Sequence, residues 1–212
     1  MKIKQIQNNP FQENTYVIWD EGSKEAAIID CGALFPQEEE KIEHFVAENE
    51  LKIKYLLNTH AHLDHCFGNA WAANRYDVNL MIHADDEALL AQMGVQAKIF
   101  GLPVEVKTVK LGGYLNDGDV LMLGKNRIEV IHTPGHSRGG VCFYILSSGW
   151  LVSGDSLFAG SIGRTDLEGG SYATLIKSIK DRLITLPEET VVYPGHGPYT
   201  TIGDEKKMNP FL

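Results

Sequence analysis

Three histidines and one aspartate fall within six residues of this chain, at His60, His62, Asp64 and His65, directly after the apolar run at 53–57. Imidazole and carboxylate are ligands of divalent zinc and iron. Residues two apart on an extended segment point the same way, so His60 and His62 can bind one ion while Asp64 and His65 remain for a second. Neutral imidazoles beside a carboxylate have little reason to cluster without a cation, so a chance polar turn explains this segment poorly.

Three later segments each place a histidine or an aspartate at a glycine-containing turn that follows an apolar run. The potential ligands are His136, Asp155 and His196, preceded by Pro-Gly, Gly and Pro-Gly. Glycine lets the backbone turn sharply and proline fixes its direction, so each side chain is held by rigid elements. Each segment alone is a common kind of turn. Taken with the first cluster, the four segments strengthen one another as candidates for metal ligands.

Runs with a period of two, or rich in β-branched residues, predict strands. They cover residues 2–7, 15–19, 26–30, 53–58, 79–82, 105–110, 120–123, 127–132, 141–146, 150–153 and 190–193. Helical spacing predicts helices over 37–49, 69–76, 85–92 and 172–186, the last with Ser171 as its cap. Turn residues at 20–22 and 147–149 predict two hairpins. Two groups of strands, with helices after or between them, indicate a layered α/β sandwich.

Composition narrows the class of protein. A chain of 212 residues, 43% hydrophobic and without a compositional break, predicts a single domain over residues 1–212. The alternating N-terminal residues resemble a strand more than a signal peptide, and no window approaches the roughly 18 apolar residues of a membrane span. Cys31, Cys66 and Cys142 cannot all pair, which fits a reducing compartment. We therefore expect a cytoplasmic protein with no membrane partner. The net charge of -9 argues against a nucleic-acid partner.

The four segments, taken in order, also resemble a known family. Thr59-His-Ala-His-Leu-Asp-His65, Thr133-Pro-Gly-His136, Gly154-Asp155 and Gly195-His196 are similar to the motifs of the metallo-β-lactamase superfamily, and in particular of its glyoxalase II-like branch. The resemblance spans nearly the whole chain. It implies the αββα sandwich of that superfamily, with the site at the edge where the two sheets meet.

The resemblance implies a role for each residue. His60, His62 and His136 look like the ligands of a first metal ion, Asp64, His65 and His196 like those of a second, and Asp155 like the bridge between the two. Two divalent ions, zinc or alternatively iron, would lower the pKa of a bridging water from about 15.7 toward about 7 and polarise the carbonyl to be attacked. Asp64 would also act catalytically by orienting the hydroxide, so no serine or cysteine nucleophile is needed.

The stretch from Asp155 to Ser171 resembles the loop after the bridging aspartate in glyoxalase II-like hydrolases and persulfide dioxygenases. In that setting Arg164 could receive a substrate carboxylate, since a guanidinium binds carboxylates bidentately. Pairing of Arg164 with Asp166 or Glu168 is the alternative. Glyoxalase II has a C-terminal helical region that contributes to glutathione binding, whereas this chain ends at Leu212. We therefore expect a small-molecule thioester or ester as substrate, without a commitment to glutathione.

Two other functions remain open. An iron-dependent persulfide dioxygenase would use His60, His136 and Asp155 as its ligands and leave positions open for oxygen. A non-catalytic, metal-stabilised binding module would need only a closed ligand set. Outside the motifs, we expect His132 to be structural and His83 to be a solvated or capping residue.

Overall fold

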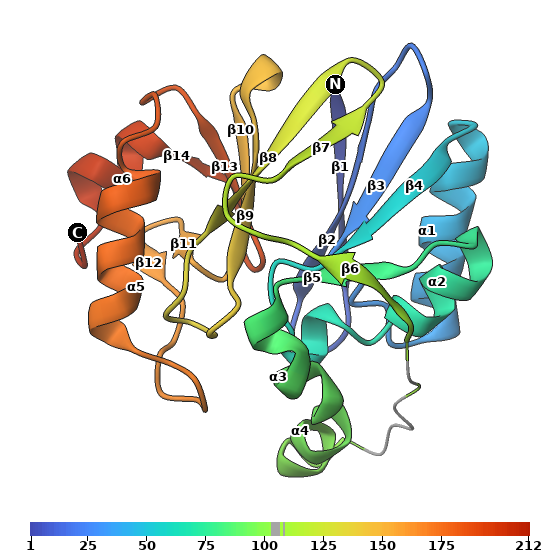
Figure 1. The fold of residues 1–212 in the computed structure, drawn as a ribbon, viewed down its shortest axis with the longest axis horizontal. Helices are drawn as coiled ribbons and strands as arrows, with labels where there is room; N and C mark the ends of the chain where they lie inside the picture. The colour runs from blue at the N-terminus through green and yellow to red at the C-terminus, as the bar shows by residue number, and fades with distance from the viewer. Residues whose placement is uncertain (103–106, 108) are drawn as a thin grey trace.

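The computed structural model describes residues 1–102, 107 and 109–212, and its described residues form two facing six-stranded sheets with helices outside each (Figure 1). The first sheet runs in chain order: β1 (Lys2–Asn8), β2 (Glu13–Trp19), β3 (Glu25–Ile29), β4 (Lys52–Leu57), β5 (Leu80–Ile82) and β6 (Leu111–Tyr114). The second sheet has the order β14 (Thr200–Thr201), β13 (Val191–Pro194), β10 (Trp150–Gly154), β9 (Val141–Ile145), β8 (Asn126–His132) and β7 (Val120–Leu123). This is the αββα sandwich that was predicted.

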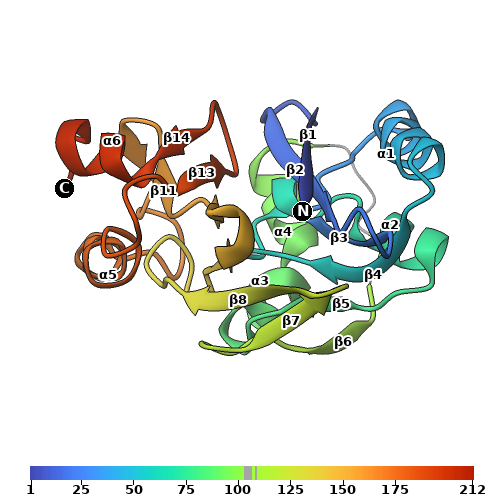
Figure 2. The ribbon, with the colours of Figure 1, turned by 90° about the horizontal axis from the view of Figure 1, so that it is seen from above.

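The helices flank the sheets in two pairs, with further short helices at one end. Helices α1 (Pro36–Glu48) and α2 (Asn69–Tyr76) cover the first sheet, while α5 (Tyr172–Ser178) and α6 (Ile202–Met208) cover the second. Figure 2 shows the two pairs on opposite sides of the molecule. Helices α3 (Glu87–Ala91) and α4 (Met93–Ile99) lie at the lower end in Figure 1, and a small hairpin of β11 (Leu157–Phe158) and β12 (Ser161–Ile162) follows β10.

Strands such as β3 and β9 are buried on both faces, which explains why they are almost continuously apolar. In β3, Ala26 and Ile28 pack under α1 and α2, whereas Ala27 and Ile29 face the second sheet. Successive side chains of a strand point to opposite faces, so an unbroken apolar run suits a strand covered on both sides. Each fully buried large aliphatic or aromatic side chain contributes about 1.5–3 kcal/mol. The resulting rigid sheets position the loops at their ends.

Strand direction brings the four predicted ligand segments to one edge. β10 and β13 are parallel, β8 and β10 are both antiparallel to β9, and β3, β4 and β5 are parallel within the first sheet. The two sheets meet at that edge, where the backbone N–H of Val141 donates to the carbonyl of Thr59 over 2.8 Å. Segments that follow β4, β8, β10 and β13 therefore converge, although they are far apart in the chain.

Most predicted elements are confirmed, and the differences are local. The predicted helix 172–186 is α5 followed by a π-helical turn at Ile179–Leu183, with Ser171 as its cap. The predicted helix 85–92 is instead a 3-10 turn at Ala84–Asp86 and the short α3. Helices α4 and α6 and strands β6, β11, β12 and β14 were not predicted. The strand expected at 105–110 falls partly on 105, 106 and 108, which lie outside the described residues. Within the described residues, no helix has the length and apolarity that a membrane crossing requires.

Candidate metal centre

Three histidines converge on one point at the edge where the sheets meet. His60 and His62 lie on the extended segment after β4, and His136 lies on the turn after β8. His136 Nε2 is 2.8 Å from His62 Nδ1 and 3.2 Å from His60 Nε2. All three side chains are buried. This arrangement can hold one metal ion through three imidazole nitrogens.

Hydrogen bonds on the outer side of the His60 and His136 rings determine which nitrogen of each ring carries the proton. Thr59 Oγ1 donates to Asp30 Oδ2 over 2.7 Å, so it must accept from His60 Nδ1, 3.0 Å away. His136 Nδ1 lies 2.7 Å from the carbonyl oxygen of Arg164, which can only accept. In the neutral rings, His60 Nε2 and His136 Nε2 therefore point two lone pairs at each other. A bound cation between them would remove this repulsion, as outer hydrogen bonds do for metal-ligating histidines generally.

A second group lies beside the first and is formed by Asp64, His65 and His196. Asp64 Oδ2 is 3.2 Å from His196 Nε2 and 3.7 Å from His65 Nε2. Asp155, which follows β10, lies between the two groups. Its carboxylate oxygens are 3.5 Å from His65 Nε2, 3.5 Å from His136 Nε2 and 3.6 Å from His196 Nε2. Asp155 thus touches ligand atoms of both groups.

The second pair of imidazoles is oriented in the same way as the first. His65 Nδ1 donates to Asp30 Oδ2 over 3.1 Å, and His196 Nδ1 donates to the carbonyl of Phe11 over 3.1 Å. Both rings therefore turn Nε2 toward the centre. Asp30 is itself buried and accepts from the backbone N–H of Thr59 over 2.7 Å, so one carboxylate orients rings of both groups.

Unpartnered buried atoms support the fit to metal ions. Among the described residues, His65 Nε2 and Asp155 Oδ1 face the centre and are buried without a hydrogen-bond partner. Leaving such a group unsatisfied costs about 1–3 kcal/mol, and more for a charged group. Five imidazoles and two carboxylates with inward-facing lone pairs form a donor set suited to divalent zinc or iron.

The local environment also sets the protonation states. Burial lowers the pKa of His62 to about 3 and holds the pKa of His60 well below its ordinary value. Burial by itself would lower the pKa of His65, but the carboxylates of Asp64 and Asp155 outweigh it and raise that pKa. Burial by itself would raise the pKa of Asp155, but His65 outweighs it and keeps the carboxyl ionised. Metal ligation needs neutral imidazoles and ionised carboxylates, and most of these groups are already in that state.

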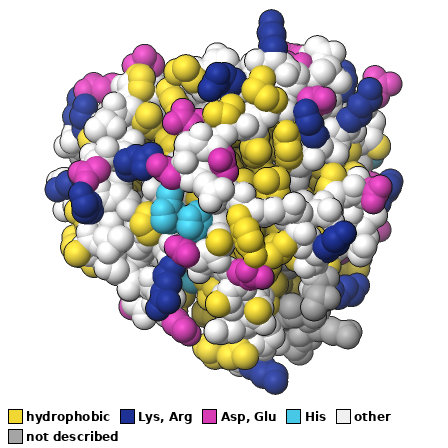
Figure 3. Space-filling view, in the orientation of Figure 1, with side chains coloured by type: hydrophobic (Ala, Val, Ile, Leu, Met, Phe, Trp, Pro, Cys, Tyr) yellow, Lys and Arg dark blue, Asp and Glu magenta, His cyan; other side chains and the backbone are white. Residues whose placement is uncertain are grey.

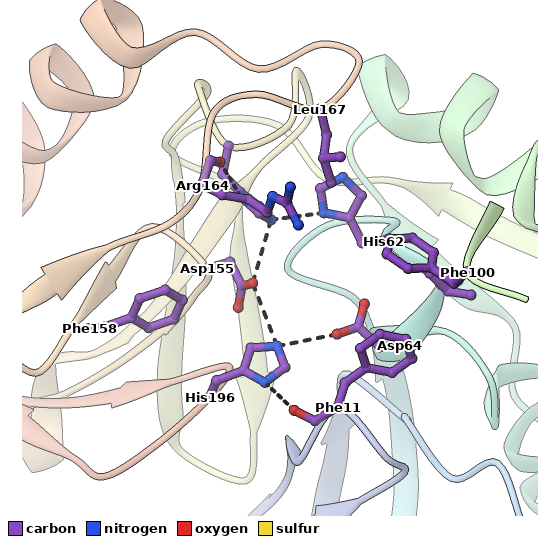
Figure 4. A pocket seen from close by; sticks show the side chains of 11 residues that line it. Phe11, His62, Asp64, Phe100, Asp155, Phe158, Arg164, Leu167 and His196 are labelled. Carbon is purple, nitrogen blue, oxygen red and sulfur yellow. Dashed lines mark hydrogen bonds and ion pairs between the residues drawn. The ribbon is translucent and has the colours of Figure 1, made fainter. Parts of the chain in front are cut away.

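A cavity of about 310 Å³ opens onto the centre (Figure 4). Its polar lining consists of Arg164 and five of the clustered residues, and its apolar lining consists of Phe11, Leu63, Phe100, Phe158 and Leu167. The rings of Phe11 and Phe100 meet edge to face, with centroids 5.6 Å apart. A small molecule that reached the centre would therefore contact an apolar wall on the way.

All seven residues predicted as metal ligands come together, while the residues predicted to lie outside the site do not. His83 caps the 3-10 turn at Ala84–Asp86 by accepting from the backbone N–H of Asp85, and His132 stacks on His83. Arg164 lines the cavity, but its guanidinium binds both oxygens of Asp166, over 2.8 and 2.7 Å. The pairing alternative is thus what the structure shows, and substrate recognition by Arg164 stays a prediction.

Two kinds of residue around the centre were not predicted from the sequence. Asp30 ends the apolar strand β3, and the pattern that singled out Asp155 after β10 could have found it. The aromatic wall had no such pattern, because Phe11, Phe100 and Phe158 come from three unrelated segments. Only the fold brings them together.

Comparison with known proteins identifies the family. Residues 8–196 match the family model described as the metallo-beta-lactamase superfamily. The hydroxyacylglutathione hydrolase GloC of Haemophilus influenzae is 38% identical over 213 residues, which cover 100% of this chain and 98% of that protein. The chain therefore belongs to the metallo-beta-lactamase superfamily, and the family predicted from its motifs is confirmed.

Solved structures show the same fold over the full length. The BLEG-1 B3 metallo-beta-lactamase is 36% identical with a TM-score of 0.90, covering 100% of this chain and 99% of that one. TTHA1623 in a di-iron-bound form is 37% identical with a TM-score of 0.87, covering 99% and 100%. ETHE1 from Myxococcus xanthus is 26% identical with a TM-score of 0.81, covering 99% and 84%.

Proposed function

We propose that this protein is a dinuclear-metal hydrolase of small thioesters or esters, similar to glyoxalase II. One observation carries the proposal: two adjacent groups of inward-facing ligand atoms share Asp155 and open onto one cavity. A site that only stabilised a fold would need one closed ligand set and no cavity. We therefore favour catalysis over a metal-stabilised binding module.

The first ion would be held by His60, His62 and His136, and the second by Asp64, His65 and His196, with Asp155 shared. When bound, two divalent cations supply a hydroxide at neutral pH and an electrophile for a carbonyl oxygen. Asp64 lines the cavity, where its carboxylate can accept a hydrogen bond from the attacking water and direct a lone pair at the acyl carbon. Zinc is the ion that we propose first.

The cavity lining suggests how a substrate is held. Phe11, Phe100 and Phe158 offer an apolar surface for an acyl chain or a carrier, and burying such groups is worth about 25 cal/mol per Å². Arg164 is the basic residue of the lining and is proposed to meet a substrate carboxylate in exchange for Asp166. Both side chains of this ion pair are more than half exposed, at 54% and 68%. Exposed ion pairs stabilise a protein by roughly 0.2–1 kcal/mol, so replacing Asp166 by a substrate carboxylate costs little free energy.

The test compares metals and substrates in one assay. Metal-free protein is reloaded with Zn²⁺ under nitrogen and offered a hydroxyacylglutathione, an N-acetylcysteamine thioester and a phenyl ester. We expect at least one of them to be hydrolysed without oxygen, with turnover that rises until two ions are bound per chain. Hydrolysis that is unchanged in the metal-free protein would refute the proposal.

The second candidate function is an iron-dependent persulfide dioxygenase. The di-iron form of TTHA1623 supports iron as the metal, and the likeness to ETHE1 fits this candidate. His60, His136 and Asp155 lie close enough together to act as its two-histidine, one-carboxylate set. Oxygen uptake with a persulfide by the iron-loaded protein, without thioester hydrolysis by the zinc-loaded protein, would favour it.

We propose that the protein acts in the cytoplasm on a small molecule and not on nucleic acid. Cys31, Cys66 and Cys142 are all free and buried, which fits a reducing compartment. On the face seen in Figure 3, basic side chains alternate with acidic ones and form no continuous stripe. Together with the net charge of -9, this surface offers little attraction to a polyanion.

A further inference from the structure

Asp86 is a buried carboxylate that joins two of the segments carrying the three-histidine group. It lies on the 3-10 turn after β5 and is 1% exposed. Its Oδ2 accepts from the backbone N–H of Ala61 over 3.0 Å and from Ser137 Oγ over 2.8 Å. Its Oδ1 accepts from the backbone N–H of Gly139 over 2.6 Å. Ala61 stands between His60 and His62 in the chain.

The contact is close and depends on glycine. A Cβ added at Gly139 would lie 2.7 Å from the backbone nitrogen of Asp86 and 2.8 Å from its Cγ. Ser137 follows His136 directly, so Asp86 bonds a residue next to each of the three histidines. It touches none of the imidazoles itself. Its position can therefore affect the three nitrogens only through the backbone.

A second contact joins the same two elements on their outer side. His83 precedes the turn that carries Asp86, and His132 ends β8, four residues before His136. Their rings stack with centroids 4.1 Å apart and planes 7° apart. One ion cannot lie in the planes of two stacked rings, so in this arrangement His83, Asp85 and His132 are not a metal site. The stack instead holds β8 against the end of β5.

We propose that Asp86 is a positioning residue that sets the spacing of His60, His62 and His136 and so the metal affinity of the first site. Three donors converge on one carboxylate, which fixes the ligand segment after β4 relative to the turn after β8. Outer partners of metal ligands generally tune affinity in this way, by about 10–100-fold on mutation. The inference rests on the proposed metal centre and is independent of the proposed substrate.

The Asp86→Asn substitution tests this with little change in volume. An asparagine offers one acceptor oxygen, so whichever way its amide turns, its NH₂ group faces the N–H of Ala61 or of Gly139. The matched control is Asp20→Asn. Asp20 also joins two distant turns, accepting from the backbone N–H of Ser23 and from Asn126 Nδ2, each over 2.8 Å. Asp20 follows Trp19 at the end of β2. The residue at the start of that strand, Glu13, is the one that pairs with His196, so Asp20 lies at the far end of β2 from the metal centre.

Three quantities are measured on both variants: Zn²⁺ affinity by chelator competition, the visible spectrum of the Co²⁺ form, and the stability of the metal-free protein in urea. We expect Asp86→Asn to weaken Zn²⁺ binding at the first site by about 10–100-fold and to change the visible spectrum of the Co²⁺ form. Asp20→Asn should keep the Zn²⁺ affinity within about twofold of the original and leave the Co²⁺ spectrum unchanged, although both variants lose stability. Ser137→Ala, which removes one donor only, should weaken binding less and serves if Asp86→Asn does not fold.

The inference is overturned if Asp86→Asn, or Ser137→Ala where that variant is used, binds Zn²⁺ as tightly as Asp20→Asn. Asp86 would then be an ordinary buried residue that contributes stability alone. If the unsubstituted protein itself binds no divalent metal, the proposed function is wrong and this inference falls with it. The two failures are therefore distinguishable.

Discussion

Gly195 offers a steric test of the second ligand group, because a single methyl group there enters the centre. A Cβ added to Gly195 would lie 2.7 Å from His65 Cε1 and even closer to Asp155 Oδ1. Ordinary van der Waals contact begins at 3.4 Å, so the imidazole of His65 must move by roughly 0.7 Å, and the carboxylate by more. A misplacement of about 1 Å in a catalytic arrangement can cost about 100-fold in rate.

We therefore expect Gly195→Ala to lower kcat/KM for a thioester by about 100-fold and to reduce the bound Zn²⁺ from two ions per chain toward one. Overpacking a buried site should also destabilise the protein by about 1–3 kcal/mol. The control is Gly113→Ala, where the nearest atom of the described residues to the added methyl group is Met81 Cε, at 3.9 Å. Steady-state kinetics measure kcat/KM, and elemental analysis measures the bound Zn²⁺ per chain, for both variants. Full activity of Gly195→Ala with two bound ions would refute the geometry described for this group.

Three further predictions concern charge. Asp155→Ala should leave the chain folded but abolish binding of the second ion and lower turnover at least about 100-fold, and unchanged turnover would remove Asp155 from its bridging role. The pKa of His62 is about 3 in the folded protein and near 6.5 in the unfolded chain. As the pH falls from 6.5 toward 3, the unfolded chain therefore binds a proton that the folded protein does not, and the free energy of unfolding decreases. Metal-free protein should thus lose about 1.6 kcal/mol of stability through His62 between pH 6.5 and 5, as measured in urea, and equal stability at both pH values would contradict this. The pKa of His65 is raised instead, so the stability that this residue contributes is lost as the pH rises above 6.5. Asp166→Asn should free Arg164 and lower KM by up to about fivefold for carboxylate-bearing thioesters only; an equal effect on neutral ones would separate Arg164 from recognition.

The sequence revealed the ligand segments because each follows a strand whose last residues are largely apolar. The last apolar residues of a strand such as β4 mark its end in the sequence, and the polar residues that follow are easily recognised. Strand pairing was not predictable in the same way, because β10 lies between β9 and β13 for reasons of long-range packing. The convergence of His60 and His136 rested on the family resemblance and not on periodicity.

Local patterns failed where the structure is short or set by tertiary contacts. Strand β6 contains Gly112 and Gly113, which have low strand propensity, and it is held by pairing with β5. Helix α4 packs Met93 and Ala97 against the metal-ligand segment but spans only seven residues, too few for a clear helical period. The role of Asp86 was hidden because its partners lie 25 to 53 residues away.

The metal content of the active protein tests the central claim most directly. Metal-free protein is titrated with Zn²⁺ under nitrogen while bound metal and thioester hydrolysis are followed together. We predict that hydrolysis reaches its maximum at two ions per chain and needs no oxygen. Saturation at a single iron, with oxygen consumed in the presence of a persulfide and no thioester cleaved, would contradict the account.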